Sequence, residues 1–314
     1  MDAQMLIDEA VAIIKDKIDD IAIIACSGGI DSTVAAVMAN NAVGDMLHCV
    51  YVDTGFMRKG ETEEVREMLT DLGLNLKVVD ASERFFKHLE GVTEPEEKRK
   101  VIGEQFIRVF EEEQVICGAK YLVQGTIAPD WIESGGGDRD VIKSHHNVGG
   151  LPEDVDLTIV EPLRDFYKDE VRNMAAEMGI PSSNRQPFPG PGLAVRVLGD
   201  LTRERTEACR EACAIVEEEF ETAAEAGEME IPWQYFAALL PVSSVGVHGD
   251  ARVYGETIVV RAVRSIDGMS ARYSEIPHAI LQKISTRITN TLKGHVNRVV
   301  YDITHKPPGT IEWE

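Results

Sequence analysis

A glycine-containing loop at residues 27–33 has the residue types best suited to binding phosphate. Its sequence is SGGIDST, and it lies between the apolar run IAIIA (21–25) and a helical pattern. Gly28 and Gly29 have no Cβ, so backbone N–H groups there can surround a polyanion, and the N-terminus of the following helix adds partial positive charge. The loop also offers three hydroxyl donors, Ser27, Ser32 and Thr33. These features predict a site for the phosphates of a nucleotide.

Asp31 distinguishes this loop from the common phosphate-binding loops. A carboxylate repels phosphate unless Mg²⁺ lies between them, so Asp31 indicates a metal-bound nucleotide. The chain has no G-K-[ST] triplet, which excludes a Walker A loop, and no G-x-G-x-x-G follows the apolar run, which excludes the dinucleotide fingerprint. The alternative is a structural turn in which Asp31 or Ser32 caps the helix.

Strand and helix patterns alternate through the first half of the chain and must position this loop. Short apolar runs are typical of strands buried on both faces of a parallel sheet. We expect strands at residues 21–25, 47–52, 76–80, 121–126 and 157–163. We expect helices at residues 5–18, directly after the loop, and at 61–72, 95–117 and 168–179. This order predicts a doubly wound, mostly parallel α/β domain with ligands at the carboxyl ends of its strands.

The pattern changes at the segment PFPGPGLAVRVLG (187–199), whose prolines and glycines cannot continue a helix. Beyond it we expect helices at 202–225 and near 275–292, and strands near 236–242, near 253–263 and at 298–303. This order predicts a second domain of the α+β class. We place the two domains at residues 1–193 and 194–314.

The composition restricts the possible partners. The chain of 314 residues has 32 Lys and Arg against 54 Asp and Glu, a formal charge of −22, which argues against a nucleic-acid-binding protein. Lysine is scarce, so the acidity fits either a protein of a salty cytoplasm or an ordinary acidic enzyme. No apolar run approaches the ~18 residues that cross a membrane, and MDAQMLIDEA (1–10) does not resemble a secretory signal. We therefore expect a cytoplasmic protein.

Cysteine and histidine do not form a recognisable metal site. The five cysteines include no CxxC pair, and we expect them to be reduced, with Cys49 and Cys117 buried. Cys209 and Cys213 share one helix face, but no third ligand stands near them. His145 and His146 are adjacent, so their side chains point apart on any regular element, which disfavours zinc.

The S-G-G-x-D-S loop resembles that of the ATP pyrophosphatases, which split ATP between its α and β phosphates and adenylate a substrate. Within that class, the whole chain is similar to the GMP synthetase family. The strings that carry this similarity are VDTGFMRKGE (52–61), KRKVIGEQFIRVF (98–110), QGTIAPDWIES (124–134), IKSHHNVGGLP (142–152), EPLRDFYKDEVR (161–172), RQPFPGPGLAVRVLG (185–199), SVGVHGDARVY (244–254) and RVVYDITHKPPGTIEWE (298–314).

One departure from the family concerns ammonia. Single-chain members begin with a glutaminase domain, whereas here the ATP loop starts at Ser27 and no cysteine stands in a G-x-C-x-G turn. The H-x-E triplet His88-Leu89-Glu90 matches a glutaminase element, but it lies beside two phenylalanines and is better interpreted as the solvated edge of a helix. The resemblance therefore implies the synthetase subunit of a two-subunit enzyme of the archaeal type, with a separate glutamine amidotransferase subunit as its partner.

The resemblance also implies the reaction and the fold. The family converts XMP to GMP with ATP and ammonia through an adenyl-XMP intermediate, releasing AMP and pyrophosphate, a step of guanine nucleotide biosynthesis. Its first domain has the adenine nucleotide alpha-hydrolase-like fold. Its second domain, here residues 194–314, makes a homodimer, and the strand VYGETIVVRAV (253–263) has a pattern suited either to that interface or to an ordinary core.

By resemblance, the nucleotide contacts can be assigned to residues of this chain. The catalytic residues are Asp31, which is also the Mg²⁺ ligand, and Lys143, which belongs to a glycine-containing lid (133–143). The ATP-binding residues are Ser27, Gly28, Gly29, Ile30, Asp31, Ser32, Thr33 and, beside adenine, Val52. The XMP-binding residues are Arg58, Arg196, Lys306, Ile311 and Glu312, the last as an acceptor for purine N–H groups or ribose hydroxyls.

Three other functions share some of these features. NAD synthetase has the same loop and chemistry, but no role there explains the PFPGPGL and KPPGTIEWE strings. A tRNA-thiolating enzyme needs a basic face and usually a cysteine pair, both of which this chain lacks. A non-catalytic nucleotide sensor has no need for Asp31 and Lys143 beside a glycine lid, although the sequence leaves a regulatory role open.

Overall fold

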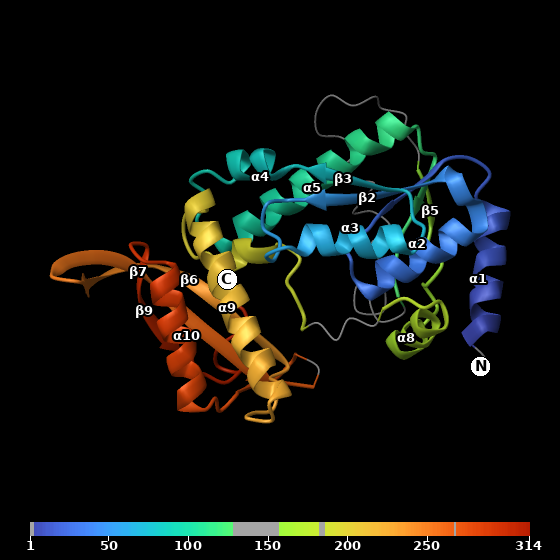
Figure 1. The fold of residues 1–314 in the computed structure, drawn as a ribbon. Coiled ribbons are helices and arrows are strands. Elements are labelled where there is room, and N and C mark those ends of the chain that lie inside the picture. The colour runs from blue at the N-terminus through green and yellow to red at the C-terminus, as the bar shows by residue number, and fades with distance from the viewer. Residues whose placement is uncertain (1–2, 128–156, 182–185, 267) are drawn as a thin grey trace. The chain divides into compact units, whose positions relative to one another are not determined.

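The computed structural model describes residues 3–127, 157–181, 186–266 and 268–314. The chain divides into two compact units, and each is described by itself (Figure 1). Unit 1 comprises residues 1–53, 62–80 and 106–184, and unit 2 comprises residues 54–61, 81–105 and 185–314. The chain therefore contributes to unit 2 twice before it enters that unit for good at residue 185.

Unit 1 is built on a parallel sheet of five strands in the order β3-β2-β1-β4-β5. The strands are β1 (Ala22–Ala25), β2 (Leu47–Asp53), β3 (Leu76–Asp80), β4 (Tyr121–Val123) and β5 (Thr158–Val160). The central strand β1 is apolar because helices cover both faces of such a sheet, and Ile23 and Ile24 are fully buried. The chain moves outward from β1 to β3 and then returns to the other side with β4. The predicted doubly wound α/β fold is confirmed.

The helices of unit 1 alternate with its strands along the chain, as the sequence predicts. They are α1 (Ala3–Lys17), α2 (Ile30–Val43), α3 (Glu61–Asp71), the second half of α5 (Pro95–Cys117) and α8 (Lys168–Glu177), with a short 3₁₀ turn η1 (Gly44–Met46). The helix α1 packs against α2 and α8. Since α2 directly follows β1, the loop between them lies at the carboxyl edge of the sheet.

Two strands of unit 1 are shorter than the sequence predicts. We expected residues 121–126 and 157–163, but β4 ends at Val123 and β5 at Val160. After β4 the chain turns at Gly125, where a Cβ would lie 3.1 Å from backbone atoms of Asp31 and Ser32. The residues that follow Val123 are Gln124, Gly125 and Thr126, so the apolar run itself ends where β4 ends.

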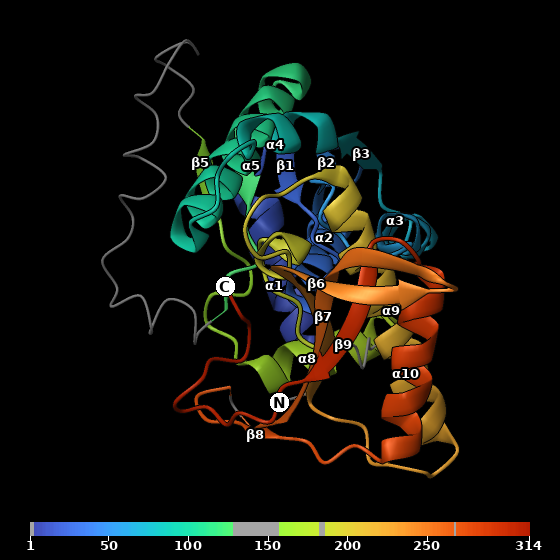
Figure 2. The same ribbon diagram turned by 90° about the vertical axis from the view of Figure 1, so that its left-hand side faces the viewer.

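Unit 2 contains a second sheet, in which β7 is central. Antiparallel β6 (Gln234–His248) and β8 (Arg272–Tyr273) and parallel β9 (Val296–Tyr301) pair with β7 (Ala251–Arg264). Figure 2 shows α9 (Arg203–Glu225) and α10 (His278–Thr291) side by side on this sheet. Unit 2 also holds α4 (Ser82–His88), the start of α5, and a 3₁₀ turn η2 (Gly192–Val195). The predicted α+β class is confirmed.

The hairpin of β6 and β7 is longer than the sequence predicts. We expected strands near 236–242 and 253–263, whereas pairing continues to His248 and resumes at Ala251. In Figure 1 the far ends of both strands extend beyond α9 and α10. Valines there alternate with other residues, but the valines are not buried: Val245 and Val247 are both exposed. Because strand prediction depended on burial, it missed a segment that pairs only with itself.

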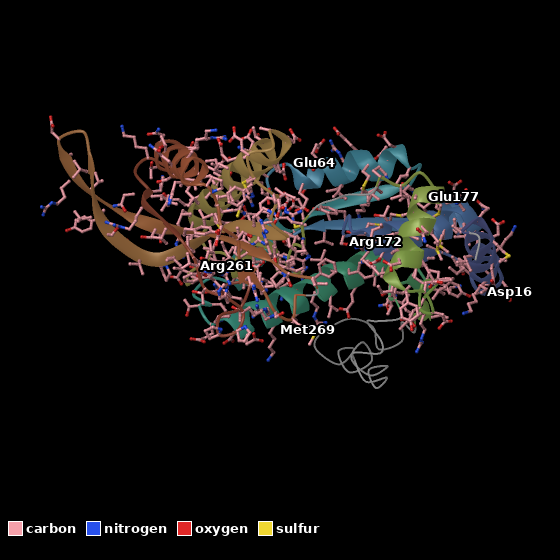
Figure 3. All side chains as sticks on the ribbon, turned by 90° about the horizontal axis from the view of Figure 1, so that it is seen from below. Asp16, Glu64, Arg172, Glu177, Arg261 and Met269 are labelled. Carbon is pink, nitrogen blue, oxygen red and sulfur yellow. The ribbon has the colours of Figure 1, made fainter. Side chains whose placement is uncertain are left out.

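The interior of unit 2 contains charged residues that hydropathy places on a surface. Lys98, Arg196 and Arg261 are each completely buried. Arg261 lies within β7, among the apolar residues of the sheet (Figure 3). A buried cation is stable only when it is paired and hydrogen-bonded, so each of these residues must have fixed partners.

Several further observations concern single side chains. Cys49 is buried as expected, but the prediction for Cys117 is wrong, since it is only half-buried at the end of α5. The thiols of Cys209 and Cys213 both donate to the backbone oxygen of Ala237, so they lie on one buried face.

Across the described parts of the chain, no group of three or more acidic, cysteine or histidine side chains could hold a metal. His88 and Glu90 are exposed beside α4, as the solvated-edge interpretation predicts. None of the described helices is long and apolar enough to cross a membrane.

Candidate nucleotide sites

The loop between β1 and α2 begins with a glycine in a conformation that other residues rarely adopt. Gly28 has φ +78°, and a Cβ on it would lie 2.5 Å from Cγ2 of Val65. Gly29 is the N-cap residue of α2, and no side chain forms a capping hydrogen bond at this end of the helix. The alternative in which Asp31 or Ser32 caps this helix is therefore wrong. The first N–H groups of α2 have no partner within the helix and suit an anion at this end.

The hydroxyl groups of the loop bind one another and the loop backbone. Oγ of Ser27 lies 3.1 Å from Oγ of Ser32 and accepts a 3.3 Å hydrogen bond from the backbone N–H of Gly29. The hydroxyls of Ser32 and Thr33 donate to the carbonyl of Gly29 over 3.0 and 2.8 Å. Ser27 is exposed whereas Thr33 is buried. The contacts fix the loop conformation and leave the Ser27 hydroxyl at its outer surface.

Asp31 has one paired and one unpaired carboxylate oxygen. Oδ2 lies 2.5 Å from Nζ of Lys168, the first residue of α8. Oδ1 is buried, and no donor among the described residues reaches it. An unpartnered buried carboxylate oxygen beside a phosphate-type loop fits a hard cation such as Mg²⁺, which binds through one or two carboxylates together with substrate phosphates.

Two other residues of unit 1 complete the surroundings of the loop. Gly125 follows β4, which is the neighbour of β1. Because Gly125 has no Cβ, the segment after β4 can pass directly beside the backbone of Asp31. Val52 lies buried near the end of β2, the other neighbour of β1. Since all three strands are parallel, their carboxyl ends meet at one edge of the sheet, which is where doubly wound folds bind nucleotides.

In unit 2, Arg196 binds Glu312 through two parallel hydrogen bonds. Nε and Nη2 of Arg196 lie 3.1 and 2.9 Å from the two carboxylate oxygens of Glu312. Burial alone would lower the pKa of the Arg196 guanidinium, but the Glu312 carboxylate outweighs it, so the pKa is raised. Gln234 donates a third hydrogen bond to Glu312 over 3.0 Å. These three hydrogen bonds hold the Glu312 carboxylate in one orientation.

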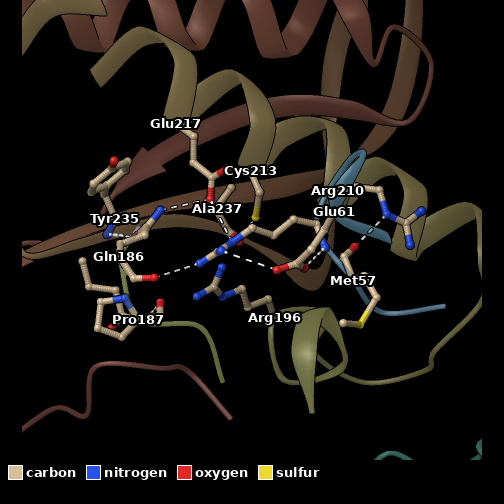
Figure 4. A network of polar contacts seen from close by, with 12 residues as sticks. Met57, Glu61, Gln186, Pro187, Arg196, Arg210, Cys213, Glu217, Tyr235 and Ala237 are labelled. Carbon is tan, nitrogen blue, oxygen red and sulfur yellow. Dashed lines mark hydrogen bonds and ion pairs between the residues drawn. The ribbon is translucent and has the colours of Figure 1, made fainter. Parts of the chain in front are cut away.

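Arg58 lies in the same region of unit 2 as Arg196. Figure 4 shows Arg196 in this region together with Gln186 and Glu217. Both guanidinium groups face the ring of Phe188, at 4.3 and 5.0 Å from its centre. Arg58 donates to the carbonyl of Gln186 over 3.0 Å and lies 3.6 Å from the carboxylate of Glu217. Burial raises the pKa of Glu217, although both arginines oppose this. Arg58 also lies 3.7 Å from the carboxylate of Glu61, so three carboxylates, Glu61, Glu217 and Glu312, surround the two arginines.

The segment 302–314 is held in place along its length. Lys306 pairs with Ala271 through both backbone groups, and its Nζ donates to the carbonyl of Gly268 over 2.8 Å. At the far end, the buried ammonium of Lys98 contacts the Glu314 carboxylate and donates to the carbonyl of Val197 over 2.8 Å. Ile311 is half-buried. A frayed terminal segment is thereby excluded.

Comparison with known proteins identifies the family. The family model described as "GMP synthase C terminal domain" matches residues 221–313, and that described as "Phosphoadenosine phosphosulfate reductase domain" matches residues 21–125. A subunit of GMP synthase [glutamine-hydrolyzing] from Thermococcus kodakarensis is 59% identical over 312 residues, covering 98% of this chain and 98% of the relative. The protein of the same name from Pyrococcus furiosus is 57% identical over 315 residues, covering 99% and 97%. The chain belongs to this family of GMP synthase subunits.

A further relative shows how the GMP synthase subunit family compares with a longer protein. GMP synthase [glutamine-hydrolyzing] of Clostridium tetani is 54% identical over 312 residues, which is 98% of this chain and 60% of that relative. The resemblance to GMP synthetases deduced from the sequence strings is therefore confirmed. So is the fold class, through the match of the first half to an adenine-nucleotide-type domain and of the second half to the GMP synthase C-terminal domain.

The residues predicted from the resemblance to GMP synthetases fall into three groups. The predicted ATP residues lie together in unit 1. The predicted XMP residues lie in unit 2. Arg196 contacts Glu312, and the guanidinium groups of Arg196 and Arg58 face the same phenylalanine ring. The Lys306 ammonium instead contacts the carbonyl of Gly268. Lys143, His145 and His146 lie outside the described residues.

Sequence reasoning missed several residues that organise these sites. Lys168 and Lys98 stand inside the quoted strings EPLRDFYKDEVR and KRKVIGEQFIRVF, so those strings were a signal that was available but not interpreted. Gln234 and Arg261 had no such signal. Gln234 begins a strand and Arg261 interrupts an apolar one, and only the folded positions of their partners give them a role.

Proposed function

We propose that this chain is the ATP-using synthetase subunit of a two-subunit GMP synthase and converts XMP to GMP with ATP and ammonia. The proposal rests on membership of the GMP synthase subunit family together with one structural observation. That observation is the loop of residues 27–33, whose glycines, hydroxyls and unpartnered Asp31 oxygen suit a magnesium-bound triphosphate. A protein of this kind would work in the cytoplasm, where ATP and purine nucleotides are abundant.

The residue types follow from the chemistry of the exchange at C2 of XMP. Oxide is a poor leaving group, so O2 first attacks the α-phosphate of ATP, a new P–O bond forms, and pyrophosphate leaves. Ammonia then adds to C2, the C–O bond breaks, and AMP departs with loss of a proton from nitrogen. Both substrates are polyanions and the chain carries a formal charge of −22, so cations must be concentrated locally at the site.

In unit 1 we assign the phosphates of ATP to the loop Ser27–Thr33, with Gly28, Gly29, Ile30 and Ser32 contributing backbone or hydroxyl donors. Val52 would contact adenine. Asp31 would bind Mg²⁺, and this metal, when bound, neutralises phosphate charge. Lys143 would stabilise the charge that develops on the α-phosphate during adenylation.

In unit 2 we assign XMP to Arg58, Arg196, Lys306, Ile311 and Glu312. An ionised carboxylate has about four lone-pair positions for donors. Arg196 and Gln234 occupy three on Glu312, which leaves one for a purine N–H or a ribose hydroxyl. Arg196 would thus act mainly by fixing Glu312, and the half-exposed Lys306 would meet the 5′-phosphate.

We propose two protein partners. The first is a separate glutamine amidotransferase subunit, which is supported by the name of the relatives, since each is called a subunit of a glutamine-hydrolyzing enzyme. The second is another copy of this chain, and the exposed apolar residues Val242, Val247 and Tyr254 on the β6–β7 hairpin support an interface there. Val247→Asp should raise the monomer fraction measured by light scattering, and an unchanged assembly would place the interface elsewhere.

An omission assay tests the proposed reaction. The chain is incubated with Mg·ATP, XMP and ammonium chloride, and the products are resolved by mass spectrometry. We expect GMP, AMP and pyrophosphate to appear together, and glutamine alone to be unable to replace ammonium. Pyrophosphate release with nicotinic acid adenine dinucleotide but not with XMP would refute the proposal and favour NAD synthetase.

A further inference from the structure

Arg261 is a fully buried cation that none of the proposed nucleotide contacts uses. It lies in β7 (Figure 3), and its guanidinium contacts the segment 302–310. Nη1 donates to the carbonyl of Thr304 over 2.5 Å and lies 3.3 Å from the Asp302 carboxylate. Nη2 donates to the carbonyl of Thr310 over 2.9 Å. Nη1 also donates to the carbonyl of Asp302 over 3.5 Å, so Arg261 binds the backbone of this segment at Asp302 and Thr304 on one side and at Thr310 on the other.

These contacts lie on either side of the turn that carries Lys306. Thr304 precedes the sequence His-Lys-Pro-Pro-Gly, and Thr310 follows it. Pro307 and Pro308 have no backbone N–H, so this stretch can form few hydrogen bonds of its own. Within the turn the N–H of Gly309 donates to the carbonyl of His305 over 3.0 Å. Ala271 pairs with the backbone of Lys306 inside the turn, and the guanidinium of Arg261 connects the two ends of the turn to each other.

We propose that Arg261 is a positioning residue of the XMP site, which fixes the turn so that Lys306 can reach the 5′-phosphate. The inference rests on the proposed function, since it takes XMP as the ligand of Lys306. In the structure Nζ of Lys306 donates to the carbonyl of Gly268, and phosphate would replace this neutral acceptor by a charged one. A turn already fixed at both ends needs little further ordering when the nucleotide binds, and that saving appears as affinity.

The geometry requires arginine rather than any cation. The planar guanidinium presents two Nη groups at a fixed separation, and each binds a different carbonyl. A lysine ammonium in the same place keeps the charge near Asp302 but can reach only one end of the turn. Arg261→Lys is therefore the informative substitution, because it removes the double contact and keeps the buried ion pair.

The experiment measures dissociation constants of XMP, xanthosine and ATP by calorimetry with the full chain. We expect Arg261→Lys to weaken XMP about tenfold, the effect of one or two lost hydrogen bonds. Binding of ATP should change less than about twofold. The matched control is Arg264→Lys on the same strand, whose exposed guanidinium pairs with Glu230, and it should leave all three constants unchanged.

Xanthosine and Lys306→Ala separate positioning from general support of the fold. Xanthosine lacks the 5′-phosphate, so Arg261→Lys should not affect its binding. If Arg261 acts through Lys306, the double variant should bind XMP no more than about twofold more weakly than Lys306→Ala alone, because the two effects are not independent. Full additivity, or equal weakening of xanthosine and XMP, would overturn the proposal.

Failure of this inference is distinguishable from failure of the proposed function. If wild type does not bind XMP, the proposed function fails. If Lys306→Ala weakens XMP but Arg261→Lys does not, the positioning role alone is refuted. Should Arg261→Lys not fold, as judged by circular dichroism, Asp302→Asn takes its place. That variant removes the ion pair to Arg261, and we expect a smaller loss of XMP affinity that is again non-additive with Lys306→Ala; additivity would refute the inference.

Discussion

Asp31→Asn separates a catalytic role of the phosphate loop from a structural one. The substitution keeps the shape of the side chain and removes its charge, together with the ion pair to Lys168. The two side chains are 25% and 41% exposed, so solvent screens the pair. Loss of such a pair costs about 0.2–1 kcal/mol. In domains of about 150–250 residues, that corresponds to a fall in melting temperature of no more than about 4 °C.

The effect on the reaction should be much larger than the effect on stability. Removing one group that stabilises charge on a transferring phosphoryl group typically slows the reaction about 10²–10³-fold, which is about 2.7–4 kcal/mol. Asp31 has a second reason for a large effect, because its buried Oδ1 has no partner among the described residues and is the oxygen available to Mg²⁺. The loss in adenylation should therefore exceed the loss in stability at least about 2.7-fold in free energy.

The assay is XMP-dependent release of pyrophosphate from Mg·ATP at saturating substrate, with thermal unfolding measured on the same samples. Lys168→Gln is the matched control, since it breaks the same ion pair and leaves Asp31 in place. We expect both variants to melt within a few degrees of wild type, but only Asp31→Asn to lose about 10²-fold or more in rate. A rate within tenfold of wild type, or an equal loss in Lys168→Gln, would refute the reasoning.

Two further predictions concern unit 2. Burial raises the pKa of Glu217 above its usual 4.5, against Arg58 and Arg196, so this carboxyl stabilises the fold below that value and the contribution is lost as pH rises through the raised pKa. Urea unfolding from pH 4 to 7 should therefore show Glu217→Gln gaining stability relative to wild type, and a constant difference would contradict this. Gly192→Ala places a Cβ 2.3 Å from the carbonyl of Phe56 at φ +64° and should cost more than about 1–2 kcal/mol, whereas Gly190→Ala, with open space around it, should be nearly neutral in the same unfolding measurement.

The elements that the sequence predicted well are those whose apolar spacing is complete within the element itself. The strand at 76–80 and the helix at 95–117 have the bounds that their apolar spacing indicated. The phosphate loop was identified because glycines, hydroxyls and a carboxylate stand together within seven residues. Prediction failed where a distant partner decides the role of a residue, as for Lys168, whose ammonium pairs with Asp31.

The same reason explains why the buried cations of unit 2 were missed. Lys98 is separated from Glu314 by more than 200 residues, and Arg261 stands between the apolar runs IVV and AV of its strand. Their hydropathy alone does not distinguish Lys98 and Arg261 from surface residues. Their burial depends on carbonyl and carboxylate partners that only the folded segment 302–314 supplies.

The segment 302–314 is attached to unit 2 by three carboxylates, each paired with a different buried cation. Asp302 contacts Arg261, Glu312 contacts Arg196, and Glu314 contacts Lys98. Removing one partner of such a pair leaves an uncompensated buried charge, which typically costs about 3–5 kcal/mol. The cations that organise this segment are therefore already neutralised and fixed.

A site for a polyanion then needs other cations. In the segment 302–314 the available cation is the half-exposed Lys306, whose ammonium contacts only a neutral carbonyl among the described residues. The division is physically consistent: buried cations paired with carboxylates set the position of the segment, and one unneutralised ammonium remains to attract phosphate. An acidic chain can thus present a local positive site without a basic surface, because its carboxylates are used to fix the structure around the one cation that stays available.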